Sequence, residues 1–444
     1  MKKKILSMLL SMVLTVACFT GCGSNPSSGG ETGGAASTET PKNPEDMYTV
    51  TMAVIGNDQE DMDLVEAEMN KILAEKVGAQ IDVITLGWGV YQQQLQLMLS
   101  GAEKLDLVPI MYNNVSTYVN SGQVLDMSDL IDQYGVNMKA ALGEDILKIA
   151  NMNGYVYGVP VEKEWYADSC LVMRKDILDK YNLDVSNVKS LADCAPIFET
   201  IHENEPDMKI IVGAKDSLIG NVYFADVLSD RFGVLDNGGA DTTIVNYYET
   251  DNYKNLAATV HDYYEKGYID KDMATSTDAG TTTLKAGNAF CFATPYKPGV
   301  AEQESLNTGY ELVAVRINPT PAFCYTNAVA AITWGIGQNC ENPEMTMKVL
   351  DYMYGDPELM NLFNWGIEGV HYVVKDAEND VIGFPDGVDA SNAKYNLNMG
   401  WELPNQYKIH VWEGSSRKIM DAQKEMNATA NKSKALGFMF DSTS

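Results

Sequence analysis

The sequence NMNGYVYGVPVEKEW, Asn151 to Trp165, is the stretch from which we infer how the rest of the chain is organised. It has a turn signal at Asn153 and Gly154, then a short β-prone run that Gly158 and Pro160 interrupt. This pattern predicts a strand that leaves one lobe and enters another. Charged and aromatic side chains of the kind that line a cleft follow it: Glu162, Glu164, Trp165 and Tyr166. Taken alone, the stretch also fits an ordinary turn followed by a solvated loop.

Length and composition set the first limits on the protein class. A chain of 444 residues is long for one core and suits two lobes. Its 45% hydrophobic and 21% charged residues are typical of a globular protein. The formal net charge of -29 argues against nucleic acid or anionic lipid as a partner.

The N-terminus has the features of a bacterial targeting segment. Lys2 to Lys4 precede an apolar run from Ile5 to Ala17, which is too short to remain as a membrane-spanning helix. Phe19-Thr20-Gly21-Cys22 then resembles a lipobox, with Phe19 where leucine is usual. We expect a signal peptide over residues 1–21, a lipid on Cys22 rather than Cys18, and a flexible tether over residues 22–46, which is poor in large apolar residues.

Cysteine and histidine spacing favours neither a disulfide framework nor a metal site. The 7 cysteines show no C-x-x-C spacing, and the 4 histidines lie far apart. The sequence also lacks G-x-S-x-G, H-E-x-x-H, the P-loop and the EF-hand, and the segment from Gly335 to Cys340 lacks the third glycine of a dinucleotide fingerprint. We therefore expect no metal, no cofactor and no catalysis. A carboxylate pair for glycoside hydrolysis stays an alternative, since 61 residues are acidic.

An alternation of strands and helices begins at Tyr48. β-rich runs at 49–55, 81–86 and 105–111 alternate with helical periodicity at 64–77 and 91–99, which predicts a parallel sheet covered by helices. Ligands of such sheets bind beyond the carboxyl ends of the strands. That rule points to Trp88, Tyr112 and Asn113.

A second α/β unit follows the stretch at Asn151. Ser190 to Asp193 form a plausible capping box before a helical face, and a short β run at 289–293 ends in Thr294-Pro295-Tyr296-Lys297-Pro298-Gly299. We interpret these prolines and the glycine as a second crossing. The predicted lobe 1 comprises 47–160 and 300–355, and lobe 2 comprises 161–299 and 356–444 with a C-terminal region.

Several segments, in this order, resemble family 1 extracellular solute-binding proteins of ABC importers, in the lipoprotein LplA-like subgroup. The segments are Asp63 to Glu66, Met69 to Leu73, Leu97 to Gly101, Asp106 to Val108, Asn153 to Pro160, Asn342 to Glu344, Leu350 to Tyr354, Asp356 to Glu358 and Asn364 to Tyr372. The resemblance implies an α/β, two-lobed, type II periplasmic-binding-protein-like fold that closes about a hinge around a carbohydrate. It also implies delivery of that ligand to the permease subunits of an ABC transporter.

A sugar offers an apolar C–H face and a ring of hydroxyls, so aromatic stacking combined with carboxylate or amide hydrogen bonds suits it. Core packing is the alternative role for each aromatic. Trp165→Ala is expected to weaken binding at least tenfold, about 1.4 kcal/mol, without changing the melting temperature. The candidate contacts are Trp88, Tyr112, Asn113, Glu162, Glu164, Trp165, Tyr166, Asp168, Tyr223, Tyr296, Lys297, Trp334, Trp365 and Glu368.

The sequence thus predicts a monomeric, lipid-anchored binding subunit on the extracellular face of a bacterial membrane, with an oligosaccharide as ligand. A neutral sugar is expected, although Lys297 or Arg174 would suit a uronate. The alternatives are a surface glycoside hydrolase or lyase, and a binding protein for a peptide or another small polar solute.

Overall fold

A computed structural model describes residues 46–87, 89–101, 103–215, 217–222, 225–228, 232–317, 322–389 and 392–441. The signal peptide, Cys22 and nearly all of the tether lie outside these residues, as do Trp88 and Tyr223. Residues 41–444 form one compact unit. Within the described ranges, no helix combines the length and the apolar character that crossing a membrane requires.

The first lobe is built on a five-stranded sheet with the order β2-β1-β3-β16-β6. β1 and β2 pair in parallel from Tyr48 opposite Ala79, and β3 lies parallel to β1, as the sequence predicts. β16 is antiparallel to both β3 and β6, so the sheet is mixed. Its strands are β1 (Tyr48–Ile55), β2 (Ala79–Leu86), β3 (Leu107–Met111), β6 (Val159–Pro160) and β16 (Ile332–Ile336).

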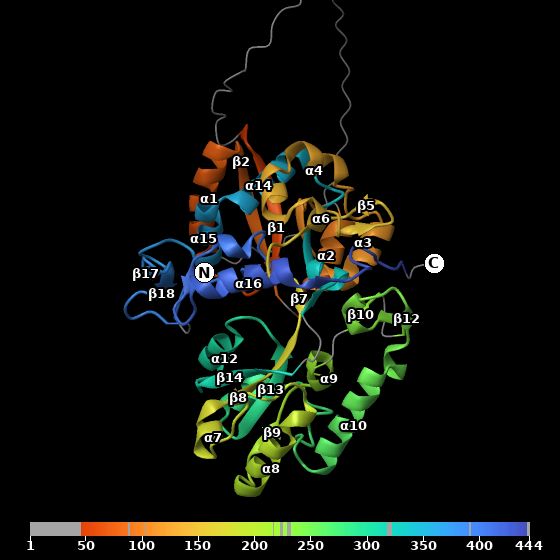
Figure 1. Cartoon of the computed structure of the whole chain (residues 1–444). Coiled ribbons are helices and arrows are strands. Elements are labelled where there is room, and N and C mark those ends of the chain that lie inside the picture. Colours follow the sequence, from red (N-terminus) through yellow and green to blue (C-terminus); the bar gives the residue numbers. More distant parts are fainter. Residues whose placement is uncertain are drawn as a thin grey trace, which may run out of the picture. The chain divides into compact units, whose positions relative to one another are not determined.

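Helices cover both faces of this sheet because successive side chains of β1 point to opposite sides. Val50, Met52 and Val54 pack in one core, whereas Ala53 packs in another. The first core includes side chains of α1 (Met62–Lys76), α14 (Pro343–Gly355) and α15 (Pro357–Trp365), and the second those of α2 (Tyr91–Ser100) and α3 (Val115–Asn120). Figure 1 shows these helices around the sheet. Further elements are α4 (Ser128–Tyr134), α5 (Val136–Leu142), α6 (Glu144–Leu147) and the hairpin β4 (Asn151–Met152) and β5 (Tyr155–Val156).

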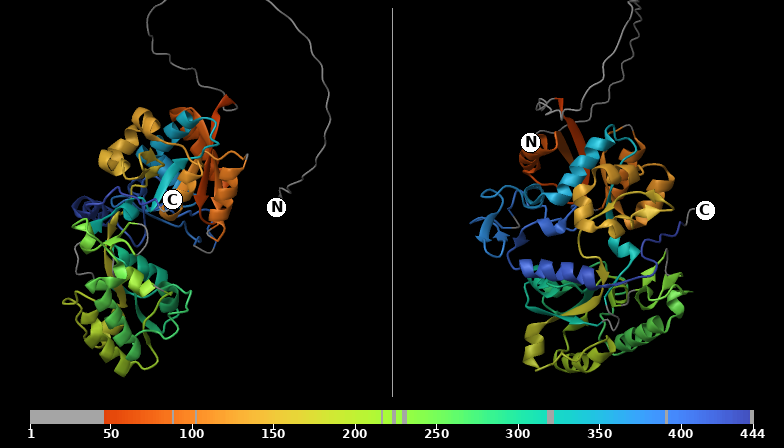
Figure 2. Two further views of the ribbon diagram at one scale, coloured as in Figure 1. Left: turned by 90° about the vertical axis from the view of Figure 1, so that its right-hand side faces the viewer. Right: turned by 45° about the horizontal axis from the view of Figure 1, so that its top comes forward.

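The second lobe is built on a four-stranded sheet with the order β14-β8-β13-β9. All six residues of β8 are buried, which fits the apolar run from Cys170 to Met173 and the inner position of the strand. β13 runs antiparallel to β8 and parallel to β9. Figure 2 shows this sheet, in which β8 is yellow and its neighbour β14 is teal, with green helices beside it. Its strands are β8 (Ser169–Arg174), β9 (Lys209–Ile211), β13 (Ala289–Pro295) and β14 (Leu312–Arg316).

A separate hydrophobic core lies under the helices of the second lobe. Phe198 and Ile201 of α8 pack there with Tyr263 of α10, which confirms the helical face predicted around Phe198. The helices are α7 (Lys175–Lys180), α8 (Ala195–Asn204), α9 (Ser217–Val222), α10 (Asp251–Glu265), α11 (Gly280–Lys285) and α12 (Val300–Thr308). A small sheet of β10 (Asp226–Val227), β11 (Val234–Leu235) and β12 (Ile244–Val245) completes this part.

The stretch from Asn151 to Trp165 does lead from one sheet to the other. Asn153 and Gly154 have φ of 54° and 92°, the left-handed conformation that a tight hairpin turn needs. The chain then adds β6 to the first sheet and continues into β7 (Tyr166–Ala167) before β8. β7, β15 (Phe323–Cys324) and β20 (Asn431–Lys432) form a three-stranded crossing sheet.

The domain boundaries differ from the prediction in two places. Pro298 and Gly299 introduce α12 rather than a crossing, and Gly299 serves as its N-cap with a φ of 84°. The chain therefore adds β14 to the second sheet before it returns, so residues 312–316 belong to lobe 2. α15 packs on α1 and belongs to the core of lobe 1, although residues 356–444 were assigned to lobe 2.

The rest of the C-terminal region combines a small sheet with a long helix. The sheet contains β17 (Val373–Asp376), β18 (Val381–Gly383) and β19 (Val411–Trp412), and β18 and β19 are parallel. α16 (Arg417–Thr429) follows, and α13 (Thr326–Val329) lies earlier, after β15.

Candidate functional site

A cavity of about 1290 Å³ lies between residues of both lobes and the C-terminal region. Lobe 1 contributes the loop after β1, lobe 2 contributes α12 and the residues just before it, and the C-terminal region contributes most of the remaining wall. Lining residues include Asn57 to Glu60, Lys163, Glu164, Lys297 to Gly299, Gln303, Leu306, Trp365, Phe384, Lys394, Trp401, Gln406, Ile409 to Ser415, Ile419, Met420 and Gln423.

The loop after β1 is held in place by polar contacts with the C-terminal region. Lys394 forms an ion pair with Glu60 at 2.9 Å, and the backbone N–H of Asn396 donates to Oε1 of Gln59 at 2.8 Å. This loop follows the carboxyl end of a parallel strand, where ligands of α/β sheets bind. The cavity thus lies at the edge of the sheet to which the positional rule points. Of the residues that the rule selected, Trp88 lies outside the described residues, and Tyr112 and Asn113 do not line the cavity.

A polar cluster forms another part of the wall. It lies at the two segments that the sequence predicts as crossings between the lobes. Nζ of Lys297 lies 3.4 Å from Glu164, and Nε2 of Gln406 donates to the same carboxylate at 3.0 Å. Burial would raise the pKa of Glu164, but the charges of Lys297 and Lys163 outweigh it and lower that pKa to about 2. Glu164 is therefore ionised at neutral pH and neutralises Lys297.

Aromatic rings form an apolar section of the wall. The rings of Trp365 and Trp412 lie 4.9 Å apart at 33°, and Phe384 meets Trp412 edge-on at 4.7 Å. Trp401 also lines the cavity. Packed aromatic faces beside polar groups are what a sugar ring requires.

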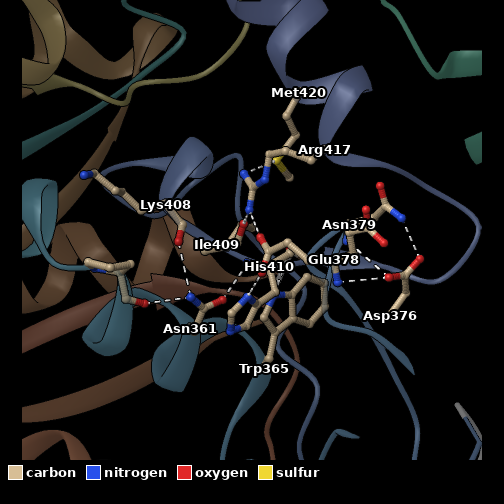
Figure 3. A network of polar contacts seen from close by, with 12 residues as sticks. Asn361, Trp365, Asp376, Glu378, Asn379, Lys408, Ile409, His410, Arg417 and Met420 are labelled. Carbon is tan, nitrogen blue, oxygen red and sulfur yellow. Dashed lines mark hydrogen bonds and ion pairs between the residues drawn. The ribbon is translucent and has the colours of Figure 1, made fainter. Parts of the chain in front are cut away.

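A hydrogen-bond network fixes the segment from Lys408 to His410, which leads into β19 (Figure 3). The side chain of Asn361 accepts from the backbone N–H of His410 at 2.6 Å and donates to the carbonyl of Lys408 at 3.2 Å. The indole N–H of Trp365 donates to the carbonyl of His410 at 3.2 Å. The wall is thus rigidly attached to α15 of lobe 1.

Three predicted contacts do line this cavity: Glu164, Lys297 and Trp365. Trp365 is only 4% exposed and also packs in the core of lobe 1. Glu162 and Asp168 are buried instead in ion pairs, Glu162 with Lys424 at 3.2 Å and Asp168 with Arg316. Tyr112, Asn113, Tyr296 and Glu368 are not among the lining residues. Arg174, considered as an anchor for a uronate, pairs with Asp176.

The structure gives Trp165, Tyr166 and Trp334 packing roles, so the prediction of these residues as contacts needs correction. Trp334 is 0% exposed, and its indole N–H donates to the carbonyl of Glu402 at 2.8 Å. Trp165 is 8% exposed, and its indole N–H donates to the carbonyl of Val161 at 2.9 Å. Both rings are used by the core of lobe 1.

Sequence reasoning missed Phe384, Trp401, His410 and Trp412 as lining residues. A usable signal existed at Trp412, because His410-Val411-Trp412 is β-prone and Gly414-Ser415-Ser416 follows as a turn signal. This is the same combination of a strand end and an aromatic that selected Trp165.

The wall carries a slight excess of acidic groups: Asp58, Glu60, Glu164 and Glu413 line it together with Lys163, Lys297 and Lys394. Of the lining lysines, Lys297 and Lys394 pair with Glu164 and Glu60. Among the residues that the structure describes, no group of three histidine, cysteine or acidic side chains could hold a metal ion. The arrangement fits an uncharged ligand with hydroxyl groups better than an anion.

Comparison with known proteins identifies the family. Residues 56–359 match the family model described as bacterial extracellular solute-binding protein. A carbohydrate ABC transporter substrate-binding protein of Streptococcus pneumoniae is 28% identical over 399 residues, which cover 89% of this chain and 79% of the relative.

Solved structures agree with this result. The N-glycan transport solute-binding protein NgtS of Streptococcus pneumoniae matches with a TM-score of 0.79 at 26% identity, covering 89% of this chain and 86% of NgtS. Its complexes with Man1GlcNAc and Man5GlcNAc match with TM-scores of 0.71 and 0.66 at the same identity, and the coverage stays within one percentage point. The LplA-like subgroup stays a prediction. The chain belongs to the family of bacterial extracellular solute-binding proteins.

Proposed function

We propose that this protein is a lipid-anchored binding subunit that captures a neutral oligosaccharide in the cavity and delivers it to the permease of an ABC transporter. The observation that supports this most strongly is the wall itself, in which Trp365, Trp412 and Phe384 pack together beside paired charges. The stacked rings supply a surface for the C–H face of a sugar, and the polar groups around them suit its hydroxyls.

The size of the cavity favours an oligosaccharide over a single sugar. Its volume of about 1290 Å³ exceeds the roughly 300–1,000 Å³ of pockets that hold drug-sized ligands. Aromatic residues at separate positions along the wall, such as Trp401 and Trp412, would contact different sugar units. A mannose- and N-acetylglucosamine-containing glycan is the ligand class we propose, supported by the two glycans named in the NgtS complexes.

We further propose that the ligand closes the two lobes about the crossing sheet. The TM-score of this chain falls from 0.79 to 0.66 between NgtS described without a glycan and its Man5GlcNAc complex, at unchanged identity. The NgtS structures therefore differ from one another, as hinge motion would require. A ligand drives such closure by binding the closed state more tightly than the open one.

The anchor and the monomeric state are also proposals. Cys22 would carry the lipid, and residues 22–46 would hold the body at the outer surface of the membrane. Mass spectrometry of the protein purified from bacterial membranes tests the anchor. A lipidated N-terminal peptide that begins at Cys22 supports it, and an unmodified Cys22 in the mature chain contradicts it.

Calorimetric titration with a glycan panel, combined with chromatography of the glycans afterwards, tests the proposed function. Man1GlcNAc and Man5GlcNAc are the first ligands, with a short peptide pool as the comparison. We expect stoichiometric heat and unaltered glycan. New reducing ends would instead support a glycoside hydrolase, and heat from the peptide pool alone would support a peptide-binding protein.

A further inference from the structure

The side chain of His410 forms a hydrogen bond with the carboxylate of Asp380. Nδ1 of His410 lies 2.5 Å from Oδ1 of Asp380, and Arg417 contacts the other carboxylate oxygen. The backbone of His410 is fixed separately, through Asn361 and Trp365. The carboxylate of Asp380 therefore contacts the imidazole ring directly, while its backbone carbonyl accepts from the N–H of Val411 at 3.1 Å.

The register of the small sheet explains why these groups meet. β18 and β19 pair in parallel with Val381 opposite Val411, so the preceding residues Asp380 and His410 lie side by side. Asp380 has a φ of 59°, a left-handed conformation that aspartate tolerates better than most residues. Local backbone strain of this kind persists where the surrounding contacts fix it, often at binding sites.

Arg417 connects the ion pair to the start of α16. Besides contacting Asp380, its guanidinium donates to the carbonyl of Ile409 at 2.8 Å and to the carbonyl of Tyr407 at 3.3 Å. Asp380, Arg417 and His410 thus form one connected group. Figure 3 shows Arg417 and His410 beside Asn361 and Trp365.

The charge of Asp380 determines which nitrogen of His410 carries the proton. Burial would raise the pKa of Asp380, but the hydrogen bonds from Arg417 and His410 outweigh it and lower that pKa. An ionised carboxylate accepts a hydrogen bond, so Nδ1 of His410 must donate it. In the neutral ring, Nε2 is then an acceptor. Nothing in the described part of the chain hydrogen-bonds to Nε2.

Nε2 and the indole of Trp412 belong to the same part of the cavity wall. Both residues line the cavity, and the side chain of His410 is 30% exposed. Val411, the first residue of β19, separates the two positions and pairs with Val381 of β18. A sugar ring stacked on Trp412 would bring a hydroxyl within reach of His410.

We propose that His410 and Trp412 form one sugar subsite, in which Nε2 of His410 accepts a hydrogen bond from a ligand hydroxyl, and that Asp380 and Arg417 are its positioning residues. This inference rests on the proposed function and adds to it the residues that orient one sugar unit. It also predicts that the subsite selects a hydroxyl donor, which an ether or a deoxygenated sugar does not supply.

The test measures the affinity of the full chain for Man1GlcNAc and Man5GlcNAc in variants of this group. His410→Asn keeps an amide N–H where Nδ1 lies, so it still donates to Asp380, but it lacks Nε2. We expect it to bind about tenfold more weakly with a melting temperature close to that of the wild type. His410→Gln, whose amide reaches the position of Nε2, is expected to restore much of the affinity.

Asp380→Asn is expected to weaken binding several-fold, because an amide no longer requires the proton on Nδ1. In the His410→Asn background the same substitution should have no further effect, since Asp380 acts through the imidazole. Asp176→Asn is the matched control, because Asp176 pairs with Arg174 at a similar distance but lies in lobe 2, away from the cavity. It should leave the affinity unchanged.

A ligand-side measurement covers the case in which a variant folds poorly. Among monodeoxy analogues of Man1GlcNAc, one should lose about tenfold in affinity for the wild type and little for His410→Asn, which lacks the acceptor. The subsite is contradicted if His410→Asn binds within twofold of the wild type, if Asp380→Asn still weakens binding in the His410→Asn background, or if no analogue discriminates. A wild-type protein that binds neither glycan overturns the proposed function, and the subsite with it.

Discussion

Single tryptophans differ in what their rings already contact, and this decides what each substitution would do. Trp165 is 8% exposed and packed among residues of the lobe 1 core, whereas Trp412 is partly exposed and lines the cavity. Both follow a strand end in the sequence. The sequence alone favoured Trp165 as the ligand contact, and the structure favours Trp412.

Trp165→Ala and Trp412→Ala should therefore have opposite dominant effects. Removing the buried Trp165 ring leaves a cavity in the core and should cost about 3–5 kcal/mol of unfolding free energy. Trp412→Ala should weaken glycan binding at least tenfold with a smaller loss of stability. Urea unfolding and calorimetry on both variants separate the two roles. A Trp165→Ala protein of normal stability that has lost binding would restore the interpretation that the sequence gave first.

Glu402 is a buried carboxyl group directly beside the cavity residue Trp401. Its Oε1 accepts from the backbone N–H of Ile55 at 2.8 Å, and its Oε2 has no hydrogen-bond partner among the described groups. Burial raises the pKa of Glu402 from 4.5 to about 8. The side chain is therefore protonated in the folded protein at neutral pH.

This raised pKa makes the stability depend on pH in a defined direction. Below about pH 4.5 both folded and unfolded chains hold the proton, and the full contribution is present. As the pH rises towards 8, the unfolded chain releases the proton first, so the contribution is lost. Glu402→Gln removes this dependence.

Melting curves of the wild type and of Glu402→Gln at several pH values test that prediction. Between pH 5 and pH 8 the melting temperature of the wild type should fall by several degrees relative to that of Glu402→Gln. At pH 8 only the wild type must either take up a proton or bury a charge when it folds. Glu378→Gln, at an exposed position, is the control and should follow the wild type. Parallel curves for the wild type and Glu402→Gln would mean that Glu402 is already ionised in the folded protein at pH 5.

The sequence located three of the lining residues but not the side chains that complete the wall. Glu164 and Lys297 were found because turn signals mark both segments. Trp334 was misassigned because its partner is the carbonyl of Glu402, which lies 68 residues further along the chain. Local pattern does not determine whether an aromatic faces the core or a cavity when the deciding contact is this distant.

At the scale of elements, helix and strand positions were better predicted than their partners. The sequence placed α1, α2 and the first three strands, since periodicity and composition are local signals. The sequence placed α15 in the wrong lobe. An apolar helix face predicts that the helix is buried, but it does not indicate which of the two cores the helix packs against. Pro298 and Gly299 precede the helix α12, but the same residue types also occur in turns between lobes, and the sequence analysis interpreted them as a crossing.

α16 links the C-terminal region to the segment between β6 and β7. Asn427 accepts from the backbone N–H of Trp165 at 2.8 Å and donates to the carbonyl of Lys163 at 2.6 Å. Gln423 donates to the carbonyl of Pro298 at 2.9 Å. α16 therefore contacts two segments that are far apart in the sequence: Lys163 to Trp165, before β7, and Pro298, before α12.

Asn427→Ala removes both hydrogen bonds to this segment and leaves a backbone N–H and a carbonyl without their partner. We expect it to lower the unfolding free energy by about 2 kcal/mol. The midpoint of urea unfolding measures the loss. Glu425→Ala, two residues away and exposed, is the control and should stay within about 0.5 kcal/mol of the wild type. Equal midpoints for the two variants would show that α16 does not stabilise the crossing.

At the scale of the whole molecule, each lobe has its own sheet and its own core, and the crossing sheet of β7, β15 and β20 is separate from both. Few dihedral angles need to change for two such lobes to move, which is the usual basis of hinge closure. The cavity is lined from both lobes, so a bound glycan would contact both at once. The family, the fold and the site are consistent with one mechanism, in which the ligand stabilises the closed state.

Small-angle X-ray scattering of the protein with and without saturating Man5GlcNAc tests this claim most directly. Calorimetry on the same samples establishes that the glycan is bound. The account predicts a smaller radius of gyration in the glycan-bound sample, because the ligand favours the closed state. An identical radius of gyration in the two samples, with binding confirmed, would contradict it.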